Sequence, residues 1–281
     1  MPRDALVVLG DSLTHHDARR LVPADDPALW PVRLADALGW DLHLAARAGW
    51  TCRDAWWALT ADPALWAALP RAGAVIVATS TMDSMPSPLP TTVRESIRAI
   101  RPARLRRRVR AGYKAAQPHA ARLGRPQALS PGATADHLGR IVTALRAVRP
   151  GTPVIATLPA THRSREYGFA HPARARTRRA IEGVAATHGL PLLDLGVTDD
   201  HVRSGRGNPD GIHWGPEGHA LVADAARAHL DAAVRLAPLG TVCSAPLWVT
   251  IGRVGHGTGA KRPKSLTAFG LQCEALGCCL C

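Results

Sequence analysis

Several features that mark other classes of protein are missing from this sequence. It has no apolar run near the roughly 18 residues of a membrane-spanning helix. The apolar run within residues 1–12 is too short for a signal peptide. Neither a metal-ligand spacing of His, Cys, Asp and Glu nor a Gly-rich phosphate loop occurs. We therefore expect a cytoplasmic protein without integral membrane association, and with no metal or other bound cofactor.

Cysteine is almost absent from the first 238 residues, where Cys52 stands alone. The other five cysteines all lie in residues 239–281, which also gather Gly and show no hydrophobic period. We expect one domain over residues 1–238, and a tail over 239–281 that is disordered or non-native and has no part in chemistry.

Acidic residues are outnumbered: 35 Lys and Arg stand against 22 Asp and Glu, a formal net charge of +13. Such a charge raises the local concentration of anionic partners, among them nucleic acid, anionic lipid and a phosphorylated donor such as acyl-CoA. A soluble protein with many surface arginines is the plainer interpretation. The 46% of hydrophobic residues suffices for the core of one α/β domain.

Strand and helix patterns alternate along the chain. Short apolar, β-branched runs predict strands over residues 4–9, 41–46, 73–79, 152–158 and 190–195. Helical spacing predicts helices over 27–39, 54–69 (interrupted at Pro63), 134–149, 173–188 and 216–236. This alternation predicts an α/β fold, a parallel sheet with helices on both faces.

A basic insertion interrupts the alternation at about residues 84–132. Between residues 94 and 125 it carries many arginines against the single acid Glu95, and it is longer than the usual connection in an α/β domain. A segment of this length is typical of an insertion or of a lid. Tyr113 is its only aromatic residue, which argues against a stacking platform for nucleic acid, so we expect no nucleic-acid partner.

Two short motifs carry the chemistry. Ser12 follows Gly10 and Asp11 at the end of the first predicted strand, where parallel sheets place their sites. Asp210 and His213 stand three residues apart before the last helix. A serine hydroxyl needs a base, and an aspartate orients the imidazole that serves as one. The two motifs together predict a Ser12–His213–Asp210 triad that transfers acyl groups.

These motifs resemble the GDSL and DxxH blocks of the SGNH (GDSL-like) hydrolase superfamily. The resemblance implies a flavodoxin-like three-layer α/β/α fold and an oxyanion hole formed by the backbone N–H groups of Ser12 and Gly49. One block departs: Met82 stands in STMDS where the superfamily has the Asn of GxND. Methionine cannot donate a hydrogen bond, so the third oxyanion donor of the superfamily is missing.

Longer stretches, among them MDSMPSPLP and SGRGNPDGIHW, resemble one actinobacterial branch, the diglucosylglycerate octanoyltransferases of methylglucose lipopolysaccharide biosynthesis. The resemblance covers about residues 5–235 and implies octanoyl-CoA as co-substrate and a diglucosylglycerate-type sugar as acceptor. A carbohydrate esterase or lipase, with water as acceptor, is the alternative. A catalytically inactive basic binding protein is the second alternative.

Further side chains stand near the predicted strand ends or near the two motifs. Arginine binds anionic groups in bidentate fashion, aromatic rings stack on sugars, and Met adapts to acyl chains. The candidate substrate-binding residues are Trp50, Arg53, Met82, Asp83, His162, Arg165 and Arg206.

Overall fold

The computed structural model describes residues 4–15, 22–87, 89, 93, 96–123 and 126–236. The expected 239–281 tail lies outside these residues. Within them, no helix is long and apolar enough to cross a membrane.

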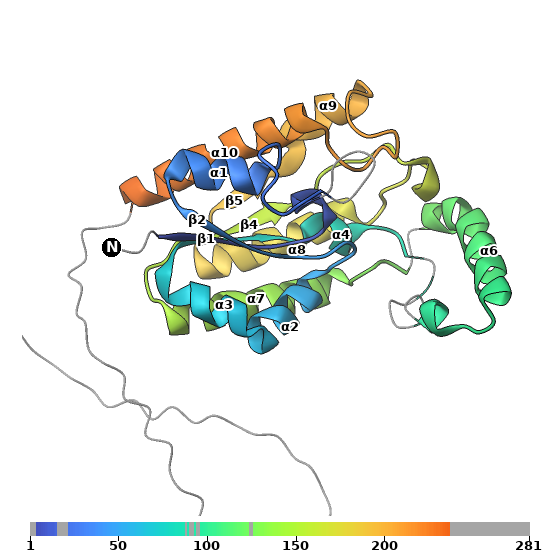
Figure 1. Ribbon diagram of the computed structural model, residues 1–281, viewed down its shortest axis with the longest axis horizontal. Helices are drawn as coiled ribbons and strands as arrows, with labels where there is room; N and C mark the ends of the chain where they lie inside the picture. The colour runs from blue at the N-terminus through green and yellow to red at the C-terminus, as the bar shows by residue number, and fades with distance from the viewer. Residues whose placement is uncertain are drawn as a thin grey trace, which may run out of the picture. The chain divides into compact units, whose positions relative to one another are not determined.

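A sheet of five parallel strands forms the centre of the domain (Figure 1). The strands are Ala5–Gly10 (β1), Asp41–Ala46 (β2), Ala72–Ala78 (β3), Val154–Leu158 (β4) and Leu192–Asp194 (β5). Their order in the sheet is β2-β1-β3-β4-β5. This is the flavodoxin-like order, in which the chain reverses direction across the sheet beside β1. All residues of β1 and β4 are buried, as their continuous apolar runs predict.

Helices cover both faces of the sheet, so the predicted three-layer fold is confirmed (Figure 1). Leu6, Val8 and Ile76 pack in the core on the side of α1 and α10, whereas Val7 and Leu9 pack on the opposite side. The longer helices are Trp30–Leu38 (α1), Cys52–Ala61 (α2), Pro63–Ala68 (α3), Pro131–Val148 (α7), Arg174–His188 (α8) and Pro216–Leu236 (α10).

Caps move some helix boundaries away from the predicted ones. The helix expected over residues 54–69 is two helices, because the Asp62 side chain accepts the Ala64 N–H at 2.9 Å and starts α3 at Pro63. Similarly, Ser130 caps α7 by accepting the Ala133 N–H, so this helix begins at Pro131 and not at 134.

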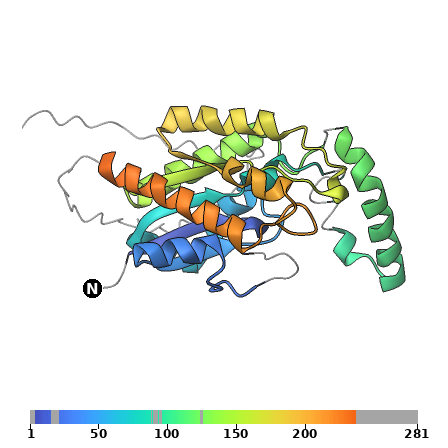
Figure 2. The same ribbon diagram turned by 90° about the horizontal axis from the view of Figure 1, so that it is seen from above.

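The predicted insertion leaves and re-enters the domain at one place. Pro86 pairs with Gln127, and the Ala128 N–H donates to the Met85 carbonyl at 2.9 Å. Between these points lie the short helix Ile97–Ala99 (η3) and the long helix Ala103–Arg122 (α6). In Figure 2, α6 stands apart from the helices that flank the sheet.

Helix α6 rests on the segment that follows β4. That segment contains the short helix Arg165–Tyr167 (η4). A Cβ at Gly168 would lie 2.3 Å from the Pro118 carbonyl oxygen, so the two backbones meet closely there. Gly168 also has a φ of 58°, which favours glycine. This contact holds α6 beside the carboxyl ends of the strands.

Candidate active site

Ser12 begins the short helix Ser12–Thr14 (η1) directly after β1. Asp11 caps this helix by accepting the Leu13 N–H at 2.9 Å. Gly10 must be small, because a Cβ there would lie 2.2 Å from Cγ2 of Thr14. The tight turn leaves Ser12 partly exposed at the carboxyl end of a central strand.

The structure brings His213 and Asp210 to Ser12. His213 Nε2 lies 2.8 Å from Ser12 Oγ, although the residues are 201 positions apart. His213 Nδ1 lies 2.5 Å from Asp210 Oδ2. An imidazole with one nitrogen on a hydroxyl and the other on a carboxylate is placed to accept the hydroxyl proton and to be stabilised once charged.

Asp210 is held in its ionised form. Burial raises the pKa of this carboxyl, but the His213 ring, the Ile212 N–H and the His213 N–H act against it and bring the pKa below its ordinary value. The two backbone groups donate to Asp210 Oδ1 at 2.8 and 3.0 Å. The three-residue spacing of the motif thus lets one carboxylate bind both the backbone and the ring of the same turn.

The loop that carries Asp210 and His213 is attached to the segment after β4. The Arg163 N–H donates to the Gly211 carbonyl at 2.7 Å. Gly211 has a φ of 70°, and a Cβ there would lie 2.5 Å from the Arg163 carbonyl oxygen. A side chain at this position would therefore both strain the backbone and push the loop away.

Gly49 lies in the turn after β2, the neighbour of β1. Gly10 pairs with Ala46 in the sheet, and the Arg47 N–H donates to the Gly10 carbonyl at 3.4 Å. Gly49 itself has a φ of 81°, which an L side chain rarely adopts. The turns of Ser12 and Gly49 therefore follow adjacent strand ends.

Met82 lies in the short helix Ser80–Ser84 (α4) after β3. Its backbone N–H donates to Asp11 Oδ2 at 3.3 Å, which ties α4 to the Ser12 turn. Burial raises the pKa of Asp11 to about 6, while the Leu13 N–H, the His213 charge and the Met82 N–H lower it. Because this N–H binds Asp11 and the side chain has no donor, Met82 offers no third oxyanion donor.

Asp83, predicted to bind substrate, instead lies in the interior with 0% of its surface exposed. Its Oδ1 accepts the Cys52 N–H at 2.8 Å, at the start of α2. Burial raises the pKa of Asp83 to about 8, despite that hydrogen bond. The expectation is corrected: Asp83 is a buried carboxyl that joins α4 to α2 beneath the site.

Replacement of Asp83 by Asn should remove a pH dependence of stability. The native pKa lies above the unfolded value of 3.8, so the stabilising contribution of Asp83 is complete below pH 3.8 and is lost as the pH rises towards 8. Between pH 5 and pH 8 the free energy of unfolding of the parent should fall by about 4 kcal/mol more than that of Asp83→Asn. Urea unfolding at both pH values measures the difference, and equal falls in the two proteins would refute the assignment.

Three other candidate substrate-binding residues are arginines that lie in different surroundings. Arg206 is engaged at the surface by Glu217, at 2.7 Å, and Arg165 is exposed in η4. The guanidinium of Arg53 lies over the Trp57 ring at 4.7 Å. None of these three lines the cavity of about 760 Å³ that opens beside Gly49.

His162 is 8% exposed and packs against the His171 ring, with 4.6 Å between centroids. Burial lowers the pKa of His162 to about 4, so the ring is neutral near pH 7. Its Nδ1 accepts the Ser164 N–H, which gives His162 a role in shaping the segment after β4.

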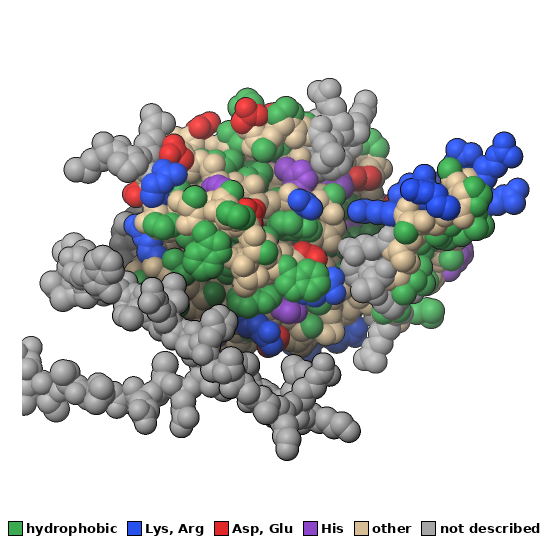
Figure 3. Space-filling model, turned by 60° about the horizontal axis from the view of Figure 1, so that its bottom comes forward, with side chains coloured by type: hydrophobic (Ala, Val, Ile, Leu, Met, Phe, Trp, Pro, Cys, Tyr) green, Lys and Arg blue, Asp and Glu red, His purple; other side chains and the backbone are tan. Residues whose placement is uncertain are grey.

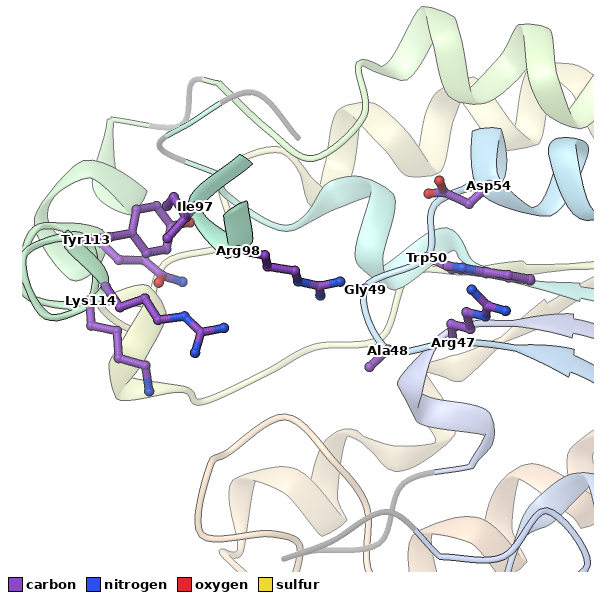
Figure 4. Close-up of a pocket in the computed structure, with 11 residues that line it drawn as sticks. Arg47, Ala48, Gly49, Trp50, Asp54, Ile97, Arg98, Tyr113 and Lys114 are labelled. Atoms are coloured by element: carbon purple, nitrogen blue, oxygen red, sulfur yellow. The ribbon is translucent and has the colours of Figure 1, made fainter. Parts of the chain in front are cut away.

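A cavity of about 760 Å³ opens beside Gly49, between the β2–α2 turn and the η3–α6 segment (Figure 4). Trp50, a predicted substrate-binding residue, lines it. The cavity also holds four cationic side chains, Arg47, Arg98, Arg110 and Lys114. The charge run of the insertion pointed to three of these, but no pattern in the sequence singled out Arg47.

Within the described ranges, no group of three or more His, Cys, Asp or Glu residues is placed to hold a metal ion.

A flavodoxin-like sheet with a Ser–His–Asp arrangement at its strand ends defines the class of serine-dependent acyl-transfer enzymes. The model of the GDSL-like Lipase/Acylhydrolase family matches residues 8–221. The chain belongs to this family, which confirms the predicted SGNH resemblance.

Two similar proteins are known as diglucosylglycerate octanoyltransferases. The one from Mycolicibacterium hassiacum is 52% identical over 223 residues, which are 79% of this chain and 92% of that protein. The one from Mycobacterium tuberculosis is 51% identical over 223 residues, 79% of this chain and 90% of that protein. These relatives favour an acyltransferase over the inactive basic binding protein.

Solved structures share the fold. The lipase/acylhydrolase from Enterococcus faecalis is 16% identical, with a TM-score of 0.54 over 85% of this chain and 100% of that one. A carbohydrate acetylesterase from Sinorhizobium meliloti is 15% identical, with a TM-score of 0.53 over 83% of this chain and 100% of that one. At such identities the likeness extends to architecture alone.

Proposed function

We propose that the protein transfers an octanoyl group from octanoyl-CoA to a hydroxyl of diglucosylglycerate through an acyl-Ser12 intermediate. The Ser12–His213–Asp210 geometry is the observation that carries the chemistry. The likeness to two diglucosylglycerate octanoyltransferases over most of the chain supports the substrates. The proposal needs no bound cofactor, and it includes a cytoplasmic location, where acyl-CoA thioesters are made.

The first half-reaction acylates the enzyme. His213 Nε2 accepts the proton of Ser12 as Oγ bonds to the thioester carbonyl carbon. The carbon–sulfur bond then breaks, and the departing sulfur takes the proton from His213, so that CoA leaves as a thiol. Asp210 stabilises the imidazolium between these steps and fixes the orientation of the ring.

The second half-reaction repeats these steps with a sugar hydroxyl. His213 accepts the hydroxyl proton while the sugar oxygen bonds to the acyl carbon of acyl-Ser12. The bond to Ser12 Oγ breaks, and the proton returns to that oxygen. One ester is formed for each thioester consumed, and the enzyme regains its starting protonation.

Both tetrahedral intermediates carry an oxyanion that needs donors. We assign this role to the backbone N–H groups of Ser12 and Gly49, whose turns follow adjacent strands. Removal of one such donor typically costs about 10²–10³ in rate. Because Met82 offers no donor, the enzyme works with backbone groups where the superfamily adds an Asn side chain.

Product analysis separates this proposal from an esterase. With octanoyl-CoA and diglucosylglycerate together, mass spectrometry should show octanoylated sugar as the main product, matched to the CoA released. Octanoyl-CoA alone should give little octanoate, because the acyl enzyme waits for its acceptor. Equal release of free octanoate with and without sugar, and no octanoylated sugar, would instead identify the esterase.

A further inference from the structure

The cavity beside Gly49 has a strong excess of positive charge. Arg47 comes from the β2–α2 turn, Arg98 from η3, and Arg110 and Lys114 from α6. Figure 4 shows Arg98 extended toward the Gly49 turn and Lys114 on the opposite wall. Among the described residues that line the cavity, Asp54 is the only acidic one.

Little of this charge is neutralised by carboxylates of the residues that the structure describes. Across the ranges that the structure describes, Arg47, Arg98 and Arg110 make no ion pair with a carboxylate. Elsewhere arginines do find partners, as Arg178 does with Asp194 at 2.7 Å.

Of the other charged side chains of the cavity, Asp54 is hydrogen-bonded within the protein and Lys114 forms a weak ion pair. Asp54 is engaged by Thr51, which donates its N–H at 2.8 Å and its hydroxyl at 2.6 Å. Lys114 lies 3.5 Å from Glu166, an exposed pair of the kind that contributes little. The Arg47 guanidinium lies over the Trp50 ring at 5.8 Å. Arg98 and Arg110, which have no carboxylate partner among the described residues, are therefore available to a ligand.

We propose that this cavity binds the phosphate groups of the CoA donor, an inference that rests on the proposed function. CoA carries a pyrophosphate and a 3′-phosphate, whereas the acceptor carries a single carboxylate, so a cluster of four cations matches the donor. Arginine binds phosphate oxygens in bidentate fashion. The volume of about 760 Å³ lies within the usual range for cofactor-sized ligands.

The surroundings of the cavity fit the same ligand. Tyr113 of α6 lines it, and an aromatic face stacks on a base such as adenine. Gly49, assigned above to the oxyanion hole, also lines it, so the cavity adjoins the turn where the thioester would react. In Figure 3, Lys and Arg side chains gather at the α6 end of the molecule, where they attract a polyanion.

Binding to a protein that cannot be acylated tests the inference without relying on the reaction. In the full-length Ser12→Ala protein, titration calorimetry would measure the affinity for CoA and for pantetheine, which lacks phosphate. Adding Arg98→Ala or Arg110→Ala should weaken CoA binding roughly tenfold each, as expected for a lost charge-assisted hydrogen bond. Pantetheine binding should change less than about twofold, which corresponds to less than RT in free energy.

Arg107 supplies the matched control, since it is exposed on α6 and does not line the cavity. Arg107→Ala should leave the affinity for CoA near that of the parent. Equal losses for Arg107→Ala and Arg98→Ala, equal losses for CoA and pantetheine, or a loss confined to diglucosylglycerate would each overturn the inference.

Failure of the inference and failure of the proposed function give different results. CoA binding that depends on Arg98 and Arg110, in a protein that makes no octanoylated sugar, supports the cavity and refutes the reaction. Octanoyl transfer with an unchanged KM for octanoyl-CoA in the Arg98→Ala/Arg110→Ala protein supports the reaction and refutes the cavity.

Discussion

Replacement of Ser12 by Ala should lower the rate of octanoyl transfer by about 10⁴-fold or more, since losing a triad nucleophile leaves only binding and oxyanion stabilisation. The hydroxyl oxygen of Ser12 lies 2.8 Å from His213 Nε2. The measurement is the initial rate of octanoylated-sugar formation with octanoyl-CoA and diglucosylglycerate.

Two comparisons make this result specific. Thr187→Ala removes an exposed hydroxyl near the C-terminal end of α8, where it donates to the Gly183 carbonyl, and should keep the parental rate. The thermal unfolding of Ser12→Ala should stay close to that of the parent, because Ser12 is partly exposed. A rate for Ser12→Ala within tenfold of the parent, in a folded protein, would contradict an acyl-Ser12 mechanism.

Loss of the base should be nearly as severe as loss of the nucleophile, and loss of its carboxylate partner less so. His213→Ala should resemble Ser12→Ala, since the two residues act as one unit. Asp210→Asn should keep a rate about 10- to 100-fold higher than His213→Ala, because the imidazole remains beside Ser12 and loses only its anionic partner, 2.5 Å from Nδ1.

The double variant Ser12→Ala/His213→Ala decides whether these residues cooperate. Its rate should equal that of either single variant, since groups acting in one step are not additive. Rates that multiply, with the double variant slower by the product of the two single effects, would show that Ser12 and His213 act independently.

The fold could be predicted because the strands have clear apolar patterns in the sequence. Ala5–Gly10 and Ala72–Ala78 are buried strands of a parallel sheet, and their apolar runs lack the alternation of half-exposed strands. The observed helix starts differ from the predicted ones where a side chain caps the helix, as Asp62 does at the start of α3. Such caps involve single hydrogen bonds, which hydrophobic spacing does not encode.

The reactive side chains could be predicted because each has a local signature. Ser12 follows a strand and a tight turn, and the Asp210–His213 spacing suits one turn of backbone. Their meeting, across 201 positions, follows from the parallel topology, which gathers strand ends at one edge of the sheet.

Burial and pairing of individual polar residues could not be predicted. Asp83 follows a strand end as a site residue would, yet its carboxyl turns inward to the N-terminus of α2. Arg206 stands near the Asp210 motif but binds Glu217. Arg47 lines the cavity, but it belongs to no sequence motif that would identify it. These outcomes depend on contacts between distant elements, which only the folded chain defines.

The most direct test of an acyl-Ser12 mechanism is the intact mass of the protein after brief mixing with octanoyl-CoA in the absence of sugar. This mechanism predicts one added octanoyl group, located on Ser12 by peptide mapping and removed when diglucosylglycerate is supplied. A protein that forms octanoylated sugar with no acyl adduct, or with an adduct on a residue other than Ser12, would contradict it.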